Sequence, residues 1–279
     1  MASYTGVQTI KTTSDIIDKI YNYKSLKLED RYYPNQFLVF KSDSQSALTR
    51  VDKSGKSAFL ISDKLKAGKI KPRNKEQFMA LDILLDDSVT VCAITGLAGS
   101  GKTIIALAMA LQKIEEGRYK QIILTRPMSQ VGKYNLGALP GTIEEKFLPY
   151  LGNFQTNLTQ IGAGKDISQL MARYDIDCIP LQLIRGCSFV DTLVICDELQ
   201  VIDEQEMLTI GTRIGEGSKL VLMGDLNQRD EKIAKTSTGL YKLMNSEIAK
   251  ESPLIGIIEL LKSERSTTAA IFSEIFESK

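Results

Sequence analysis

The stretch Gly96-Leu97-Ala98-Gly99-Ser100-Gly101-Lys102-Thr103 decides the fold of this 279-residue chain. It matches the pattern G-x-x-x-x-G-K-[ST] at every fixed position, between an apolar run at residues 89–95 and an Ala-, Leu- and Met-rich run at residues 104–113. We interpret these runs as a buried strand and a helix. The glycines then let backbone N–H groups turn around an anion, and the helix N-terminus points at the same anion. The stretch therefore predicts a phosphate-binding loop. The alternative is a glycine-rich turn before an ordinary helix.

Two residues of the loop carry more specific expectations. In a phosphate-binding loop the lysine reaches the β- and γ-phosphates of a nucleotide, and the hydroxyl residue after it holds Mg²⁺. We therefore expect Lys102 to act in catalysis and Thr103 to bind the metal. The whole loop from Gly96 to Thr103 is the expected ATP-binding segment.

The composition is that of an ordinary globular protein. Hydrophobic residues make up 43% of the chain and charged residues 25%, and the net charge of +1 gives no information about a polyanionic partner. We see no apolar stretch near the roughly 20 residues of a membrane span, and residues 1–11 lack the apolar segment of a signal peptide. The sequence therefore predicts a cytoplasmic protein without membrane contact.

Histidine is absent and the four cysteines form no C-x-x-C pair. Zinc sites, Ser-His triads and histidine relays are therefore excluded, and we interpret the cysteines as structural. Catalysis is left to carboxylates, lysine, arginine and Mg²⁺, which is typical of a nucleotide triphosphatase.

Downstream of the loop the sequence alternates between apolar strand-like runs and helix-like segments. The strand-like runs are residues 121–125, 192–196 and 219–223. This alternation predicts an α/β fold, a P-loop NTPase of RecA-like type, with a parallel sheet covered by helices on both faces. Each run is followed directly by polar residues, namely Arg126, Asp197 and Gly224-Asp225. We expect these residues to gather at one edge of the sheet.

The run Leu193-Val194-Ile195-Cys196-Asp197-Glu198 has the Walker B pattern, and we expect its strand to lie beside the loop strand. Asp197 would hold Mg²⁺ through water, and Glu198 would polarise the water that attacks the γ-phosphate. Alternatively, the two acids begin the next helix. After the following strand, Gln228 is expected to place its amide against the γ-phosphate, or its segment is an Asp-led turn.

Upstream of the loop, Gln77 precedes the expected helix at residues 78–85 and is a candidate for recognition of adenine. Asn74 is a candidate N-cap of the same helix. The segment from Lys64 to Lys75 is rich in basic residues and contains no acid. It is a candidate nucleic-acid footprint, although such runs are more often solvated surface.

The N-terminal part has a different character. An amphipathic helix is expected at residues 14–23 and a small antiparallel unit at residues 35–62. We therefore expect two parts, an N-terminal segment with a small β-rich appendage at residues 1–66 and an ATPase domain at residues 67–279.

A series of further motifs, in order along residues 70–270, closely resembles the PhoH-like ATPases, single-core relatives of the superfamily 1 helicases. These motifs are Arg126-Pro127-Met128, Leu139-Pro140-Gly141, Glu144-Glu145-Lys146 with Pro149-Tyr150, Ile184-Arg185-Gly186, Asp197-Glu198-Leu199-Gln200, Thr212-Arg213-Ile214-Gly215, Gly217-Ser218-Lys219 and Gly224-Asp225-Leu226-Asn227-Gln228. One departure is Leu199, where the family usually has alanine.

The resemblance implies an ATP- and Mg²⁺-dependent phosphohydrolase that acts on single-stranded RNA or another nucleic acid, of the kind found in phage or bacteria. It also implies a homo-oligomeric ring such as a hexamer. Residues 33–51 resemble the short β unit of family members that carry a PIN nuclease domain. Because only about 34 residues precede that unit, we expect no PIN nuclease here.

About 50 residues follow Gln228, too few for a second RecA-like core, so we expect that any mechanical work needs a ring in which a neighbouring subunit completes the ATP site with an arginine. Arg213 and Arg265 are the candidates, and each is alternatively a surface salt-bridge residue. Two other functions remain open. The chain is alternatively a nucleotide-gated regulatory module, or a small-molecule kinase, which the water-activating position of Glu198 disfavours.

Overall fold

The structure, a computed structural model, describes residues 3–127, 152–162, 166–228, 234–264, 267–268, 271–272 and 275. It contains a six-stranded sheet formed by residues 91–260 and a five-stranded sheet formed by residues 7–60. The motifs at residues 139–150 and Arg265 lie outside the described residues.

The six-stranded sheet has the order β11-β6-β10-β9-β7-β8, and all its printed pairings are parallel. This confirms the expected fold class. The carboxyl ends of the strands therefore meet at one edge, as expected. The sheet differs from expectation in one respect, because β10 separates β9 from the loop strand β6. The strands are β6 (Val91–Gly96), β7 (Gln121–Thr125), β8 (Ile176–Cys178), β9 (Thr192–Cys196), β10 (Lys219–Gly224) and β11 (Ile255–Leu260).

Both faces of this sheet are buried, which explains why its strands are continuous apolar runs rather than alternating ones. Side chains of β9 alternate between two hydrophobic clusters, with Leu193 and Ile195 in one and Val194 and Cys196 in the other. Every residue of β9 and β10 is buried.

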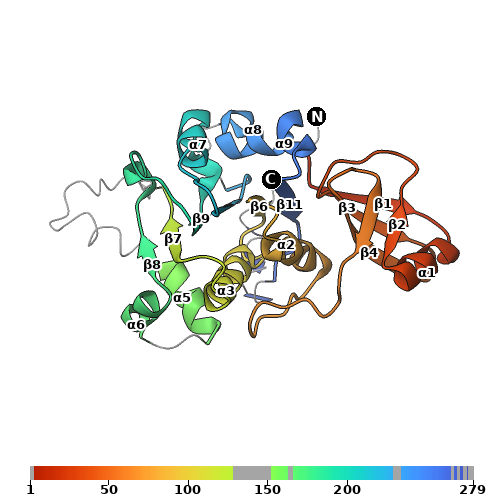
Figure 1. Cartoon of the computed structure of the whole chain (residues 1–279), viewed down its shortest axis with the longest axis horizontal. Helices are drawn as coiled ribbons and strands as arrows, with labels where there is room; N and C mark the ends of the chain where they lie inside the picture. Colours follow the sequence, from red (N-terminus) through yellow and green to blue (C-terminus); the bar gives the residue numbers. More distant parts are fainter. Residues whose placement is uncertain are drawn as a thin grey trace.

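Helices cover the sheet on both sides (Figure 1). One side carries α2 (Lys75–Leu85), α3 (Lys102–Glu115), α5 (Gly152–Gln160) and α6 (Ile167–Arg173). The other carries α7 (Glu204–Gly211), α8 (Gly239–Asn245) and α9 (Glu247–Glu251), with short 3₁₀ turns η3 (Leu181–Leu183), η4 (Leu199–Val201) and η5 (Lys235–Ser237).

Among the described residues, we find no helix with both the length and the apolar character that crossing a membrane requires.

The five-stranded sheet has the order β1-β3-β4-β5-β2, and α1 (Ser14–Tyr23) buries Ile17 and Ile20 against it. The helix at residues 14–23 is therefore confirmed. The expected antiparallel unit is present in the pairs β3–β4 and β4–β5. The sheet is larger than expected, because it begins near residue 7 with β1, which pairs with β3 in parallel. The strands are β1 (Val7–Lys11), β2 (Ser25–Lys27), β3 (Phe37–Lys41), β4 (Ser46–Val51) and β5 (Ser57–Leu60).

Polar contacts join this small sheet to the larger one. Arg50 on β4 forms ion pairs with Asp82 and Asp86 of the α2 region, at 3.0 and 2.5 Å. The Asn35 amide donates to the carbonyls of Pro253 and Ile255 at the start of β11. The second contact lies where Ile255 pairs with Val91, the first residue of β6, so these contacts attach the small sheet near the amino edge of the larger sheet.

Candidate nucleotide site

The loop between β6 and α3 adopts a conformation that requires glycine. Gly96, Gly99 and Gly101 have φ angles of 133°, 76° and 90°, a region that L-residues with side chains rarely occupy. A Cβ atom at Gly96 would also lie 2.0 Å from the carbonyl oxygen of Leu260. These positions explain the spacing of the glycines in the motif.

Lys102 begins α3, and its side chain turns back over the loop. Its ammonium group donates to the carbonyl oxygens of Gly96 and Leu97 at 2.7 and 2.9 Å. The first turn of α3 leaves backbone N–H groups without partners inside the helix, and these N–H groups and the ammonium face the same loop. The loop thus collects positive charge where a phosphate would lie.

Thr103 at the start of α3 contacts Asp197 at the end of β9, although β10 lies between β9 and the loop strand β6. The Thr103 hydroxyl donates to Asp197 Oδ2 at 3.2 Å. Asp197 is only 4% exposed, and burial raises its pKa, with further raising by Glu198 and opposition from the charges of Lys102 and Arg126. A hydroxyl beside a buried carboxylate is a pair of hard oxygen donors, which fits Mg²⁺.

Glu198 follows directly in the left-handed region, with φ of 60°. Its carboxylate accepts a hydrogen bond from the side-chain amide nitrogen of Gln200 at 2.7 Å, and the side-chain oxygen of Gln200 accepts one from the backbone N–H of Asp225 at 3.2 Å. Gln200 therefore connects the end of β9 to the end of β10.

Asp225 continues this connection to the phosphate-binding loop. Its carboxylate accepts from the backbone N–H groups of Ala98, at 2.9 Å, and Asn227, at 3.0 Å. Gln228 lies in the same turn, where its backbone N–H donates to the Asp225 carbonyl and its side chain is exposed. A chain of hydrogen bonds thus runs from Glu198 through Gln200 and Asp225 to the loop.

Arg126 comes to this edge from β7. The carbonyl of the preceding Thr125 accepts from the Asp197 N–H at 3.0 Å, and the Arg126 charge lowers the pKa of Asp197 against the effect of burial. The guanidinium therefore belongs to the electrostatic surroundings of Asp197.

Gln77 is 4% exposed and lies against the loop. Its amide nitrogen donates to the Ser100 carbonyl at 2.9 Å, and its amide oxygen accepts from the Arg73 N–H at 2.8 Å. Both ends of the amide that we assigned to adenine therefore contact backbone. Asn74 is the N-cap of α2, as expected, because its side chain accepts from the Gln77 N–H.

A cavity of about 420 Å³ adjoins the loop at Gly99 and Gly101. Its walls include Ile70 and Ile104, which are apolar, and three basic residues from the segment we considered for nucleic acid. The base and sugar of a nucleotide would lie beside this cavity if its phosphates were bound on the loop. The remaining lining residues are Lys69, Lys71, Arg73, Gln77, Ile105, Asn157, Gln160 and Glu264.

The two candidate arginines differ in position. Arg213 lies between α7 and β10, and its carbonyl accepts from Phe189, which precedes β9. Phe189 precedes β9 and Arg213 precedes β10, so Arg213 is at the amino edge of the sheet, opposite the loop. Arg265 is outside the described residues, but Glu264 before it donates its N–H to the Gly99 carbonyl at 2.9 Å.

Sequence reasoning placed Asp225 at this edge and Gln200 in a family motif, but it assigned neither side chain a role in the site. Both follow strands at the same edge, so the signal of polar residues after apolar runs was present. What the sequence does not show is which backbone groups these side chains reach. Those partners come from other strands, far away in the chain.

Comparison with known proteins gives a family match and similar proteins. Residues 69–277 match the PhoH-like protein family. Protein PhoH2 of Bacillus subtilis is 35% identical over 98% of this chain and 64% of its own length, and Protein PhoH2 of Thermobispora bispora is 33% identical over 99% and 63%. A SWI2/SNF2 ATPase core of Sulfolobus solfataricus, solved in complex with dsDNA, aligns with 68% of this chain and 39% of its own, at 14% identity and a TM-score of 0.41.

The chain thus spans a little under two thirds of the length of the two PhoH2 relatives. The family match covers the loop, both carboxylates at the end of β9 and the turn after β10. This protein therefore belongs to the PhoH-like family.

Proposed function

We propose that this protein hydrolyses ATP with Mg²⁺ and couples hydrolysis to single-stranded nucleic acid, most naturally RNA. The observation that carries the proposal is the 3.2 Å contact between Thr103 on the loop and Asp197 at the end of β9, with Glu198 next in the chain. A hydroxyl, a buried carboxylate and a second carboxylate at one point are the parts that phosphoryl transfer to water requires.

Each residue has a role that follows from its position. Lys102 and the first turn of α3 bind the β- and γ-phosphates. Thr103 and Asp197 would hold Mg²⁺, which when bound neutralises charge on the phosphates. Glu198 orients the attacking water and accepts its proton, while Gln200 fixes the Glu198 carboxylate through a 2.7 Å hydrogen bond.

The chain of hydrogen bonds from Glu198 to Ala98 supports a role in sensing the nucleotide. Loss of the γ-phosphate would alter contacts at the loop, and Asp225 and Gln200 would pass this change to the end of β9. Gln228, exposed in the same turn, is placed to respond to the γ-phosphate and to contact other molecules.

A ring of subunits is supported by the position of Arg213. It lies at the amino edge of the sheet, beside a cavity of about 320 Å³ that Arg185 and the exposed Leu208 also line. A head-to-tail arrangement would bring this edge of one subunit to the loop edge of the next. Arg213 would then neutralise charge on the γ-phosphate in the neighbouring site, a contribution worth about 10³ to 10⁵ in rate in related enzymes.

The experiment that tests the function is steady-state ATPase activity with Mg²⁺, with and without single-stranded RNA. We compare wild type, Glu198→Gln and the control Glu216→Gln, an exposed carboxylate at the opposite edge. We expect RNA to stimulate the wild type and the control. Glu198→Gln should bind ATP and fail to hydrolyse it.

Hydrolysis indifferent to RNA would instead favour a nucleotide-gated regulatory module. Robust hydrolysis by Glu198→Gln would contradict the role of Glu198, because the water would then be oriented by another group.

A further inference from the structure

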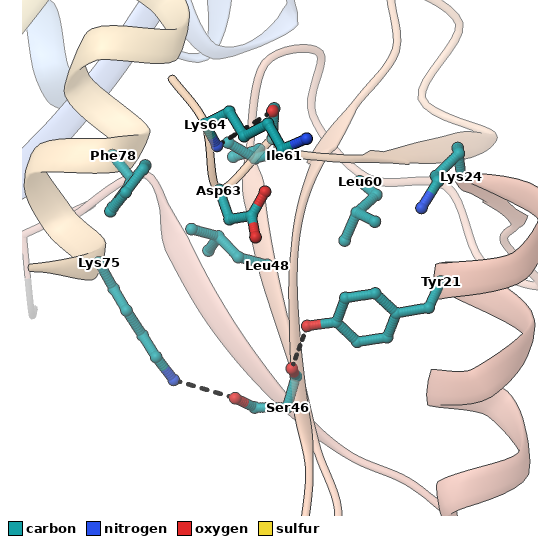
Figure 2. Close-up of a pocket in the computed structure, with 11 residues that line it drawn as sticks. Tyr21, Lys24, Ser46, Leu48, Leu60, Ile61, Asp63, Lys64, Lys75 and Phe78 are labelled. Carbon is teal, nitrogen blue, oxygen red and sulfur yellow. Dashed lines mark hydrogen bonds between the residues drawn. The ribbon is translucent and has the colours of Figure 1, made fainter. Parts of the chain in front are cut away.

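A second cavity lies between the small sheet and α2, away from the phosphate-binding loop (Figure 2). It has a volume of about 550 Å³, within the range of pockets that hold small organic ligands. Its apolar lining comes from both parts of the chain, with Leu48 on β4, Leu60 on β5, Ile61, and Phe78 on α2. A flat apolar group would be removed from water there.

Charge at this cavity is predominantly positive. Lys24, Lys64 and Lys75 line it together with a single acid, Asp63. All three lysines are exposed, and in the part of the chain that the structure describes we find no ion pair for any of them. An anionic ligand would therefore meet three cations that no carboxylate of the described residues neutralises.

An aromatic ring completes the lining. Figure 2 shows Tyr21 extending from α1 toward β4, where its hydroxyl donates to the Ser46 carbonyl at 2.9 Å. Lys75 reaches the same residue from α2 and donates to the Ser46 hydroxyl at 3.1 Å. Tyr21 remains 46% exposed, so one part of the ring is available for stacking. Stacking on an aromatic ring beside lysines is how proteins bind single strands without reading their sequence.

We propose that this cavity binds single-stranded RNA, with a base against Tyr21 and the apolar lining and with backbone phosphates on Lys24, Lys64 and Lys75. The inference rests on the proposed function, because it gives a location to the nucleic acid proposed there. The hydroxyls of Ser46 and Ser62 and the carboxylate of Asp63 line the same cavity and are suited to contact a ribose 2′-hydroxyl.

The location also explains how the strand reaches the ATP site. The basic segment leaves this cavity at Lys64, lines the cavity beside the loop with Lys69 and Arg73, and returns to this cavity at Lys75. Lys75 begins α2, and two residues later Gln77 bonds to the Ser100 carbonyl of the loop. A bound strand would therefore contact the same helical turn that supports the loop.

The test measures binding of a fluorescently labelled 12-nucleotide oligouridylate by anisotropy, without ATP or Mg²⁺. Lys24→Glu/Lys64→Glu is compared with the charge-matched control Lys19→Glu/Lys56→Glu, whose exposed lysines lie outside the cavity lining. We expect the first pair to raise Kd at least about tenfold and to lower the salt slope by about 1.4, the value for two phosphate contacts on a single strand. The control should change Kd much less.

The ring is tested separately. Tyr21→Ala should raise Kd about fivefold or more, whereas Tyr21→Phe keeps the ring and should bind like wild type. RNA should bind more tightly than oligodeoxyuridylate, and equal affinity would overturn the ribose contact. Equal effects of the cavity pair and the control pair, or unchanged binding in both, would overturn the site.

The failure of this inference and the failure of the proposed function are distinguishable. Binding is measured without nucleotide, so an inactive ATPase leaves the result on the cavity intact. Binding of a fluorescent ATP analogue, which should be equal in wild type and Lys24→Glu/Lys64→Glu, shows that the nucleotide site of the variant is intact.

Discussion

The amide of Gln77 holds the phosphate-binding loop through backbone contacts, because it bonds to Ser100 and Arg73 at its two ends. We therefore expect Gln77→Ala to weaken the binding of ATP and GTP by the same factor, about three- to tenfold, which is the cost of one or two buried hydrogen bonds. Fluorescent analogues of both nucleotides measure this. A loss confined to ATP would show instead that Gln77 reads the base.

Lys102 is the other residue whose change has a sharp outcome. Its ammonium lies over the loop at 2.7 Å from the Gly96 carbonyl, so its removal takes away the main positive charge of the loop. Lys102→Ala should abolish ATP hydrolysis and weaken nucleotide binding in equilibrium titrations. Normal turnover by the variant would place the nucleotide elsewhere in the molecule.

The identities of Lys102, Asp197 and Glu198 could be predicted because fixed spacing next to apolar runs is visible in one sequence. The partners of Gln77 and Asp225 could not. A side-chain amide near a loop can donate or accept, and a carboxylate can accept, in several directions. Only the positions of strands far apart in the chain decide which backbone group it meets.

At the scale of elements, α2 is fixed at its carboxyl end by a fully buried lysine. Lys219 on β10 donates to the carbonyls of Ile83 and Asp86, at 3.0 and 2.8 Å. Lys219→Met would remove this charged donor and leave the Ile83 carbonyl with only the weak Cys92 thiol at 3.4 Å and the Asp86 carbonyl with the Val89 N–H at 3.1 Å. We expect the free energy of unfolding in urea to fall by about 1–3 kcal/mol. Lys242→Met, on the surface of α8, is the control.

The same lysine gives a pH dependence of known sign. Burial lowers the pKa of Lys219 below its ordinary value of 10.5, so between these two values the unfolded chain binds more protons than the folded one. The stability of the wild type relative to Lys219→Met should therefore increase as pH rises toward 10.5. Burial raises the pKa of Cys92, which has the opposite effect on stability, and the Lys219 charge partly offsets that rise, so both proteins should carry Cys92→Ala in this comparison. A constant difference across this range would contradict the assignment.

The elements show where sequence reasoning is strong. The strands at residues 121–125 and 192–196 match β7 and β9, because both are continuous apolar runs that end in polar residues. β11 and β8 were not predicted. Each lies at an edge of the sheet, and the run Ile255-Gly-Ile-Ile-Glu-Leu carries a glycine and an acid that weaken the apolar pattern.

At the scale of the whole molecule, the large sheet separates Arg213 from the nucleotide site of its own chain, because the two lie at opposite edges of the sheet. The sheet order was not predictable, because the central strands are apolar on both faces and their sequences do not show which of them lies beside β6. The structure inserts β10 between β6 and β9, and it leaves Arg213 before β10 begins. Since β10 has six residues, Arg213 is on the order of 15 Å or more from the loop edge.

This separation predicts complementation between subunits. Arg213→Ala and Lys102→Ala should each be inactive alone. A mixed ring, however, contains sites in which a subunit with an intact loop receives Arg213 from its neighbour. With random assembly at equal concentrations, about a quarter of the sites meet this condition, so about a quarter of wild-type ATPase activity should return after mixing. Activity that stays at zero across all mixing ratios would mean that Arg213 does not act in a neighbouring subunit, since both defects would then have to be repaired within one chain.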